Sequence, residues 1–223
     1  MCGKKIDIKK KLDLKKRVLR SYFLRIEKDS GKELRTDLQN QILNNGMVYL
    51  QMRLPIEKLT EEFENSLNEK IEKNIYRASI RKAEPKDLSI ITDIYNKSWL
   101  TSSTPFRPIQ RETLKKIFNN QNSVILIAKV YDTFDGGFII LDFEGEDNQY
   151  GVIAGLGVLP RFQGKGLGTF LGMSAWNYFK EKGLKELRCE VYRDNQKSFD
   201  FIKGLNFEEF GRIVYRKEDF EFE

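Results

Sequence analysis

Three closely spaced glycines, Gly164, Gly166 and Gly168, lie where a buried, apolar strand pattern changes into an amphipathic helix pattern. A glycine-rich turn that leads into a helix leaves several backbone N–H groups unpaired, and the helix macrodipole adds partial positive charge at the same place. Glycine also allows positive φ and lets a ligand approach the backbone without meeting a Cβ atom. The turn is therefore predicted to bind an anion, most often a phosphate group.

Two familiar glycine motifs for nucleotide phosphates do not fit this stretch. The dinucleotide fingerprint G-x-G-x-x-G needs a third glycine, and Gly155-x-Gly157 is followed by Val-Leu-Pro instead. A Walker A loop needs Gly-Lys followed by Ser or Thr, whereas Gly164-Lys165 is followed by Gly166. The spacing thus excludes the dinucleotide and nucleoside-triphosphate versions of a phosphate site.

Strand and helix patterns alternate on both sides of the turn from residue 76 onward. Period-two apolar patterns predict strands over 76–83, 123–131, 136–144, 151–158, 184–192 and 207–217. Helical periodicity predicts helices over 84–95, 110–119, from the glycine turn to about Lys182, and over 195–204, with turns at 132–136 and 145–148. This order, β-α-α-β-β-β-α-β-α-β, predicts a mixed sheet with helices on its faces, in the α/β or α+β class.

The first 75 residues have a different character. Apolar residues four apart predict an amphipathic basic helix over 9–28, a short helix over 32–44 and, after a strand at 47–54, a third helix opened by Pro55. Residues 1–30 carry a net charge of +7 within a chain total of +6, so residues 31–223 sum to −1. We therefore divide the chain into a basic helical extension, 1–75, and a domain, 76–223.

The sequence allows more than one binding partner for this extension. An extended segment, Leu-Pro and an acidic helix faintly resemble a ribbon-helix-helix DNA-binding module, but the second helix of that module is missing. The favoured interpretation is that these helices pack on the domain or on a second subunit, as in a homodimer. Residues 1–30 could still meet an acidic partner such as RNA.

Composition removes several classes of chemistry and location. The chain has no histidine, which excludes Ser-His-Asp and Cys-His nucleophilic schemes and histidine-based metal sites, so no metal is expected. Its two cysteines do not form a disulfide framework. The apolar runs have only strand length, and the N-terminal residues contain no apolar signal segment, so no membrane span is expected. A cytoplasmic location is the prediction.

The residues around the turn resemble those of a known family. Leu156-x-Val158-x-Pro160 followed by Gln163-x-x-Gly166-x-Gly168 is similar to the acyl-CoA signature of the GNAT (Gcn5-related) N-acetyltransferase superfamily. A second signature follows, Val191-x-x-x-Asn195, and the order of elements over about 76–223 matches as well. The resemblance implies a mixed, mostly antiparallel GNAT sheet flanked by helices, with acetyl-CoA as cosubstrate.

The resemblance also implies which residues hold the cofactor. The glycine turn would bind the pyrophosphate, and backbone groups near Leu156 would hold the pantetheine amides and the reaction's oxyanion. Asn195 would lie by the pantetheine arm, and the strand before it would splay from strand 151–158 to admit the thioester. The implied cofactor-binding residues are Leu156, Gly157, Val158, Gln163, Gly164, Lys165, Gly166, Leu167, Gly168, Thr169 and Asn195.

Acid–base chemistry is less clearly encoded. Glu190 matches the strand glutamate that bacterial ribosomal-protein alanine acetyltransferases of similar pattern use as base; alternatively, it belongs only to the polar face of an alternating strand. The family's usual acid, a tyrosine seven residues after the asparagine, is Ile202 here. Tyr192, Tyr150 or Tyr215 could substitute, and a thiol with a pKa of about 8.5 can also leave as thiolate.

Acceptor choice is predicted to lie with the loop around Trp99, Phe106 and Arg107, although the two aromatic residues could equally be core anchors. The expected function is N-acetyl transfer from acetyl-CoA to a primary amine of a protein or small molecule, by direct attack in a ternary complex. The alternative is a non-catalytic acyl-CoA-binding regulator whose basic helix docks on nucleic acid or a ribonucleoprotein. Glu190 favours the enzyme, and Ile202 and the charged extension favour the regulator.

Overall fold

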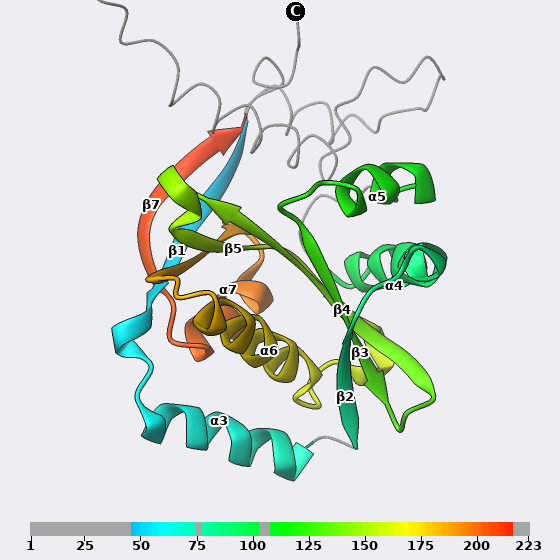
Figure 1. Cartoon of the computed structure of the whole chain (residues 1–223), viewed down its shortest axis with the longest axis horizontal. Coiled ribbons are helices and arrows are strands. Elements are labelled where there is room, and N and C mark those ends of the chain that lie inside the picture. The colour runs from blue at the N-terminus through cyan, green and yellow to red at the C-terminus, as the bar shows by residue number, and fades with distance from the viewer. Residues whose placement is uncertain (1–45, 75–76, 103–107, 216–223) are drawn as a thin grey trace, which may run out of the picture.

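The computed structural model describes residues 46–74, 77–102 and 108–215. At its centre lies a seven-stranded sheet of order β2-β3-β4-β5-β6-β1-β7 (Figure 1). Among the strand pairs of the described residues, only β5–β6 is parallel. The predicted mixed, mostly antiparallel sheet is therefore confirmed. Its strands are β1 (Met47–Pro55), β2 (Ala78–Lys82), β3 (Val124–Val130), β4 (Phe134–Glu144), β5 (Tyr150–Val158), β6 (Glu186–Tyr192) and β7 (Glu208–Tyr215).

Helices cover the two faces of the sheet unequally. Side-chain alternation along β4 sends Phe138 and Ile140 to one face and Ile139 to the other, so each face has its own buried cluster. The face packed by α4 (Leu88–Trp99) and α5 (Arg111–Phe118) is called the α4 face below. The opposite one, the α6 face, packs α6 (Leu167–Glu181), α7 (Gln196–Gly204) and α3 (Glu61–Asn74). The helices predicted at 84–95, 110–119, after the glycines and at 195–204 are confirmed.

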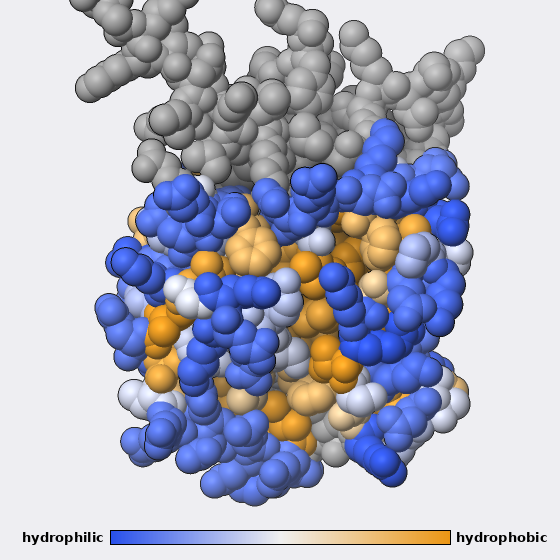
Figure 2. Space-filling view, viewed as in Figure 1, coloured by the Kyte–Doolittle hydropathy of each residue, from blue (hydrophilic) through white to orange (hydrophobic). Residues whose placement is uncertain are grey.

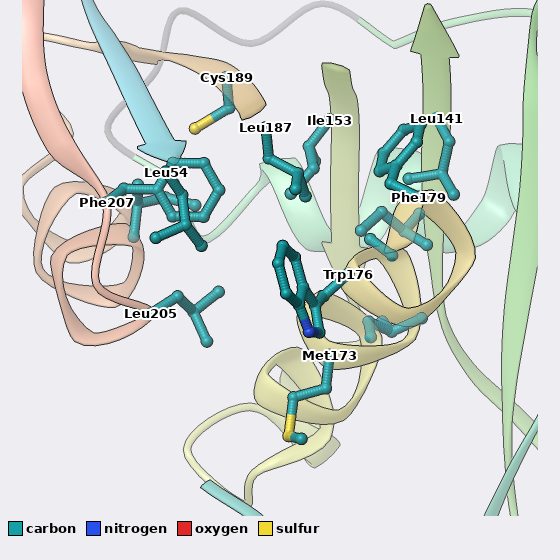
Figure 3. Close-up of a cluster of buried hydrophobic side chains, with 14 of the residues drawn as sticks. Leu54, Leu141, Ile153, Met173, Trp176, Phe179, Leu187, Cys189, Leu205 and Phe207 are labelled. Carbon is teal, nitrogen blue, oxygen red and sulfur yellow. The ribbon is translucent and has the colours of Figure 1, made fainter. Parts of the chain in front are cut away.

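The core of the α6 face holds helix α6 in place. Trp176 and Phe179 of α6 pack among side chains of the sheet and of the segment after α7, and neither ring is more than 4% exposed (Figure 3). Gly151 of β5 lies directly under this helix, because a Cβ atom there would come within 2.6 Å of the Phe179 ring. The N terminus of α6 is thereby set against the end of β5. The surface seen from the direction of Figure 1 is largely hydrophilic, with apolar side chains visible between the hydrophilic ones (Figure 2).

Strand β1 lies inside the sheet. It pairs antiparallel with β6 on one side and with β7 on the other, and Tyr49 stands opposite both Tyr192 and Ile213. The predicted strand at 47–54 is thus confirmed, but its assignment to a separate extension needs correction for residues 46–74, which share the sheet and core with the rest. The strand pattern alone does not reveal its partners, since these lie more than 130 residues away in the sequence. The helices predicted over 9–28 and 32–44 lie outside the described residues.

Two predicted boundaries were wrong. Pro55 does not open a helix: it is the last residue of β1 and leads into a short 3₁₀ turn at Ile56–Lys58. Helix α3 begins at Glu61, where the Thr60 Oγ1 accepts a hydrogen bond from the Phe63 N–H at 3.2 Å and so caps the first turn. The turn predicted over 132–136 is shorter, because β4 already begins at Phe134.

Candidate functional site

The site begins where β5 and β6 part. These strands pair in parallel only from Tyr150 to Ile153 of β5, whose last partner is Cys189. Beyond that point β5 follows β4 alone, and a register shift leaves Ala154 as an extra residue, a β-bulge. A bulge bends its strand and increases the local twist. The predicted splay between these strands is therefore present.

The backbone of β5 turns hydrogen-bonding groups into this gap. Leu159 N–H donates to the Gly136 carbonyl of β4 at 2.9 Å. In an antiparallel pair, every second residue bonds to the partner strand and the residues between them point their N–H and C=O groups the other way. By that alternation, the N–H and C=O groups of Leu156 and Val158 point away from β4. The Val158 carbonyl then accepts from Gln163 Nε2 at 2.9 Å. The N–H groups of both residues thus face the space between the strands.

The glycine turn presents further donors beside the gap. Gly164 and Gly166 have φ of 71° and 83°, in the left-handed region that favours glycine, and Gly166 is the N-cap of α6. The first backbone bond of the helix runs from Phe170 N–H to the Gly166 carbonyl at 2.9 Å. The N–H groups of residues 167–169 therefore precede the helical ladder, at the positive end of the helix dipole.

A cavity of about 450 Å³ occupies this place. Its wall includes residues of α4, on the α4 face, and of α3, α6 and α7, on the α6 face, so the cavity passes between β5 and β6 from one face to the other. Lys70 and Lys197 are the charged side chains among the described residues of this wall, which includes no carboxylate. The lining residues are Lys70, Ser98, Trp99, Thr101, Ser102, Leu156, Gly157, Val158, Gln163, Gly164, Gly166, Gly168, Thr169, Asn195, Lys197, Ser198 and Phe201.

The predicted cofactor residues are brought together here, with two exceptions. Lys165 is not on the wall, and the Leu167 side chain is only 2% exposed, in the core, so only its N–H can serve the turn. Seven residues of the wall were not predicted as site residues: Lys70, Ser98, Thr101, Ser102, Lys197, Ser198 and Phe201. Position offered a signal for Lys197 and Ser198, which follow Asn195 in the first turn of α7.

Gln163 joins three parts of the wall. Besides Val158, its amide nitrogen donates to the Thr101 Oγ1 at 3.0 Å, in the segment after α4. Its amide oxygen accepts from Lys197 Nζ at 2.7 Å, on α7. The side chain is thus positioned to hold the turn, the end of α4 and the start of α7 around the cavity.

Asn195 has a similar bridging place. Its Oδ1 accepts from the Ser198 N–H at 3.1 Å and caps α7, and its Nδ2 donates to the Ser102 Oγ at 2.9 Å. The residue is 6% exposed. Its side chain therefore sets the mouth of the gap by tying β6 and α7 to the segment after α4.

Glu190 and Tyr192 lie outside the cavity wall. Neighbouring residues of β6, Cys189 and Val191, are buried in the α6-face cluster, so Glu190 is on the α4 face. Because Cys189 is the last residue paired with β5, Glu190 stands where the gap opens. The Tyr215 hydroxyl donates to Glu190 Oε2 at 2.8 Å. Buried and partly exposed residues alternate along β6, as expected if Glu190 belongs only to the polar face of the strand. The role of Glu190 as a base stays a prediction.

Tyrosines gather on this part of the α4 face. The Tyr49 ring lies 5.6 Å from that of Tyr192 and 5.5 Å from that of Tyr215, centroid to centroid. Burial, and then the negative charge of Asp194, raises the pKa of Tyr192 above its usual value, so its hydroxyl stays protonated at neutral pH. Tyr150, by contrast, lies under the Arg188 guanidinium, 3.7 Å from the ring centre.

The position of the family's usual acid is part of the core in this chain. Ile202 of α7 is 7% exposed and packs within the α6-face cluster. An apolar side chain there can supply no proton to a leaving thiolate. A proton donor, where one is needed, must come from another residue.

Trp99 both packs against a core residue and lines the cavity, as the two interpretations of it required. Its ring stacks on Tyr95 at 4.3 Å with an interplanar angle of 13°, and it also lines the cavity. Phe106 and Arg107 lie outside the described residues. A role of these three residues in acceptor binding remains a prediction.

In the described part of the chain, no three His, Cys, Asp or Glu side chains gather as a metal site. No helix over the same residues is long and apolar enough to cross a membrane.

Comparison with known proteins adds a family. Residues 90–207 match the model of the acetyltransferase (GNAT) family. Over 67 residues the chain is 31% identical to a mycothiol acetyltransferase of Rhodococcus erythropolis. These aligned residues make up 30% of this chain and 22% of that protein. The chain therefore spans under a quarter of that relative's length.

Solved structures share the fold. An N-acetyltransferase PaiA from Thermoplasma acidophilum in complex with coenzyme A superposes with a TM-score of 0.53 at 22% identity, over 62% of this chain and 99% of that one. The ribosomal-protein-S18-alanine N-acetyltransferase of Escherichia coli superposes with a TM-score of 0.52 at 18% identity, over 60% of this chain and 80% of that one. At these identities the likeness concerns the fold alone.

Proposed function

The chain belongs to the acetyltransferase (GNAT) family, and from that premise we propose that it moves an acetyl group from acetyl-CoA to a primary amine by direct attack in a ternary complex. The observation that carries the proposal is the cavity between β5 and β6, which connects the glycine turn on one face with the open end of the splay on the other. A ligand with an anionic end and an acyl end could reach both faces through it.

The residues present fit coenzyme A. Backbone N–H groups at the start of α6, with Lys197 and Lys70 on the same wall, suit phosphate groups, and the absence of carboxylates from the described wall leaves no opposing charge there. Leu156 and Val158 would hold the amides of the pantetheine arm through their backbone groups. A cavity of about 450 Å³ is within the usual range for small-molecule sites.

Transfer itself is simple chemistry. The amine nitrogen attacks the thioester carbonyl carbon, so that an N–C bond forms, the C–S bond breaks, and the proton lost by the amine balances the one the thiolate takes up. An N–H of Leu156 or Val158, already directed into the gap, would donate to the carbonyl oxygen as negative charge develops on it. Direct attack needs no covalent enzyme intermediate.

The acceptor would enter from the α4 face. A lysine-like amine, with a pKa of about 10.4, is almost wholly protonated at neutral pH, whereas an α-amine, with a pKa of about 8, is partly unprotonated. Glu190 is the carboxylate at the opening of the gap on that face, and Tyr215 orients it. We propose Glu190 as the base, with a larger effect for lysine-like amines than for α-amines.

The activity is tested by following CoA thiol release from acetyl-CoA with peptides bearing a free N terminus, lysine peptides, polyamines and aminoglycosides. Mass spectrometry of the acceptor identifies the acetylated product. Release that depends on one acceptor class supports the proposal and names the substrate. Acetyl-CoA binding without release on any acceptor would contradict it.

Two observations favour a second candidate, the non-catalytic acyl-CoA-binding regulator. The usual acid is replaced by the buried Ile202, and Glu190 is not on the cavity wall. Binding of acetyl-CoA without turnover, together with nucleic-acid binding that is lost when residues 1–30 are deleted, would establish this candidate. A homodimer and a cytoplasmic location remain predictions for either.

A further inference from the structure

Helix α3 contributes to the cavity although it precedes the residues matched by the family model. It packs along α6 through Phe63, Leu67 and Ile71, of which Leu67 is 4% exposed (Figure 1). Glu64 Oε1 on α3 accepts from Trp176 Nε1 at 2.8 Å. This contact sets the position of α3 along α6.

The two helices run in opposite directions. Glu64, near the start of α3, meets Trp176, near the end of α6, whereas Lys70 shares the cavity wall with Thr169 at the start of α6. At 1.5 Å per residue, Glu64 to Lys70 covers about 9 Å and Trp176 to Thr169 about 10 Å, so the two spans match. Lys70 therefore lies beside the first turn of α6, where the helix N–H groups are exposed.

The charged side chains of the cavity wall near the start of α6 are all positive. Lys70 comes from α3 and Lys197 from α7, and Lys197 Nζ is 2.7 Å from the Gln163 amide oxygen of the turn. The described wall includes no carboxylate. Lys70 is exposed, and a lysine carries its charge at the end of a flexible four-carbon stem. Two cations and the positive end of a helix dipole together favour a ligand with more than one phosphate group.

We propose that Lys70 binds a phosphate group of coenzyme A, so that a helix outside the matched family region completes the cofactor site. This proposal rests on the proposed function. Coenzyme A carries a pyrophosphate and a separate 3′-phosphate, and the same lysine chemistry suits either. The β1–α3 segment would then serve both the sheet, through β1, and the cofactor, through Lys70.

Calorimetry with coenzyme A and with dephospho-coenzyme A tests the proposal on Lys70→Ala in the full chain. An exposed charge pair with phosphate predicts about threefold to tenfold weaker binding of coenzyme A, and a smaller dependence of its Kd on salt. Lys70→Arg keeps the charge and should retain most of the affinity. The matched control is Lys73→Ala, since Lys73 is on the same helix, pairs with Glu69 at 3.3 Å and is not on the wall.

A loss with both ligands would assign the contact to the pyrophosphate, and a loss with coenzyme A alone would assign it to the 3′-phosphate; both support the proposal. Unchanged affinity of Lys70→Ala, or an equal loss in Lys73→Ala, would overturn it while leaving the proposed function intact. Failure of the unmutated chain to bind coenzyme A would overturn the proposed function as well. A thermal unfolding midpoint equal to that of the unmutated chain shows that Lys70→Ala is folded.

Discussion

The proposed cofactor end and the proposed acceptor end of the site are built in different ways. The cofactor end uses backbone groups of one contiguous stretch, from Leu156 on β5 to Thr169 on α6. The acceptor end uses side chains of separate strands, with Glu190 on β6 held by Tyr215 on β7. Backbone recognition survives side-chain change, whereas proton transfer depends on single groups. Ile202 in place of the family's usual acid therefore bears on proton transfer and leaves the backbone donors of the turn in place.

The largest effect is expected for Glu190→Gln, which should change catalysis without changing cofactor binding. Glu190→Gln should lower kcat/KM by about 10²-fold or more, since a positioned base contributes that much, and should leave the Kd of acetyl-CoA unchanged because Glu190 is off the cavity wall. Steady-state rates and calorimetry measure the two quantities. Glu186→Gln, on the same strand and face and paired with Arg188, is the control. An equal loss in both variants would mean that the strand, and not the base, was affected.

The reverse pattern is expected at the glycine turn. Gly166→Val forces a branched side chain into φ of 83°, which costs about 1–3 kcal/mol, and places a Cβ atom at the phosphate site, so acetyl-CoA should bind about tenfold or more weakly. Gly183→Val carries similar strain at φ of 69°, with no atom within 4 Å of its Cβ, at the other end of α6. Similar Kd values for the two variants would show that strain, and not the cofactor, explains the loss.

A smaller effect concerns the helix that forms the α4-face wall. Arg81 donates to Asp87 at 2.6 Å, and this bond lowers the pKa of Asp87 below its usual value. Its stabilisation is therefore full above the unfolded-state pKa, about 3.9, and is lost as pH falls through the lower folded pKa. Asp87→Asn should lower the free energy of unfolding by about 1–2 kcal/mol at pH 7, and the difference should shrink below pH 4.

Urea unfolding between pH 2 and 7 measures this difference. The control is Asp93→Asn on α4, because Asp93 forms an exposed pair with Lys97 four residues on. That variant should change stability little at any pH. A constant, pH-independent loss for Asp87→Asn would contradict a role of its charge.

The smallest effect is expected at the tyrosine that orients the proposed base. Tyr215→Phe removes the hydroxyl that donates to Glu190 at 2.8 Å and keeps the ring, so a loss of about 1 kcal/mol, or about fivefold in kcat/KM, is expected. Tyr150→Phe, whose ring lies under Arg188, should change the rate less. A larger loss for Tyr150→Phe would point to the other end of the sheet as the acceptor side.

The same contrast explains what the sequence could reveal. The glycine turn and the helix after it follow one another in the chain, so local spacing predicts them, whereas the splay before Asn195 was implied only by the family resemblance. β1 between β6 and β7 could not be foreseen, because strand pairing over more than 130 residues leaves no local signal. Lys70 was missed for the same reason: only the packing of α3 on α6 brings it to the cavity. The capped start of α3 after Thr60 was misplaced at Pro55, since a strand end also suits proline.

The central claim is that coenzyme A lies in the gap between β5 and β6, with its phosphates at the start of α6. It is tested most directly by following backbone amide resonances during a titration with acetyl-CoA. We expect large shifts at Leu156 and Val158, whose N–H groups face the gap, and at residues 164–169 of the turn. Shifts confined to the turn, with Leu156 and Val158 unmoved at saturation, would contradict the claim.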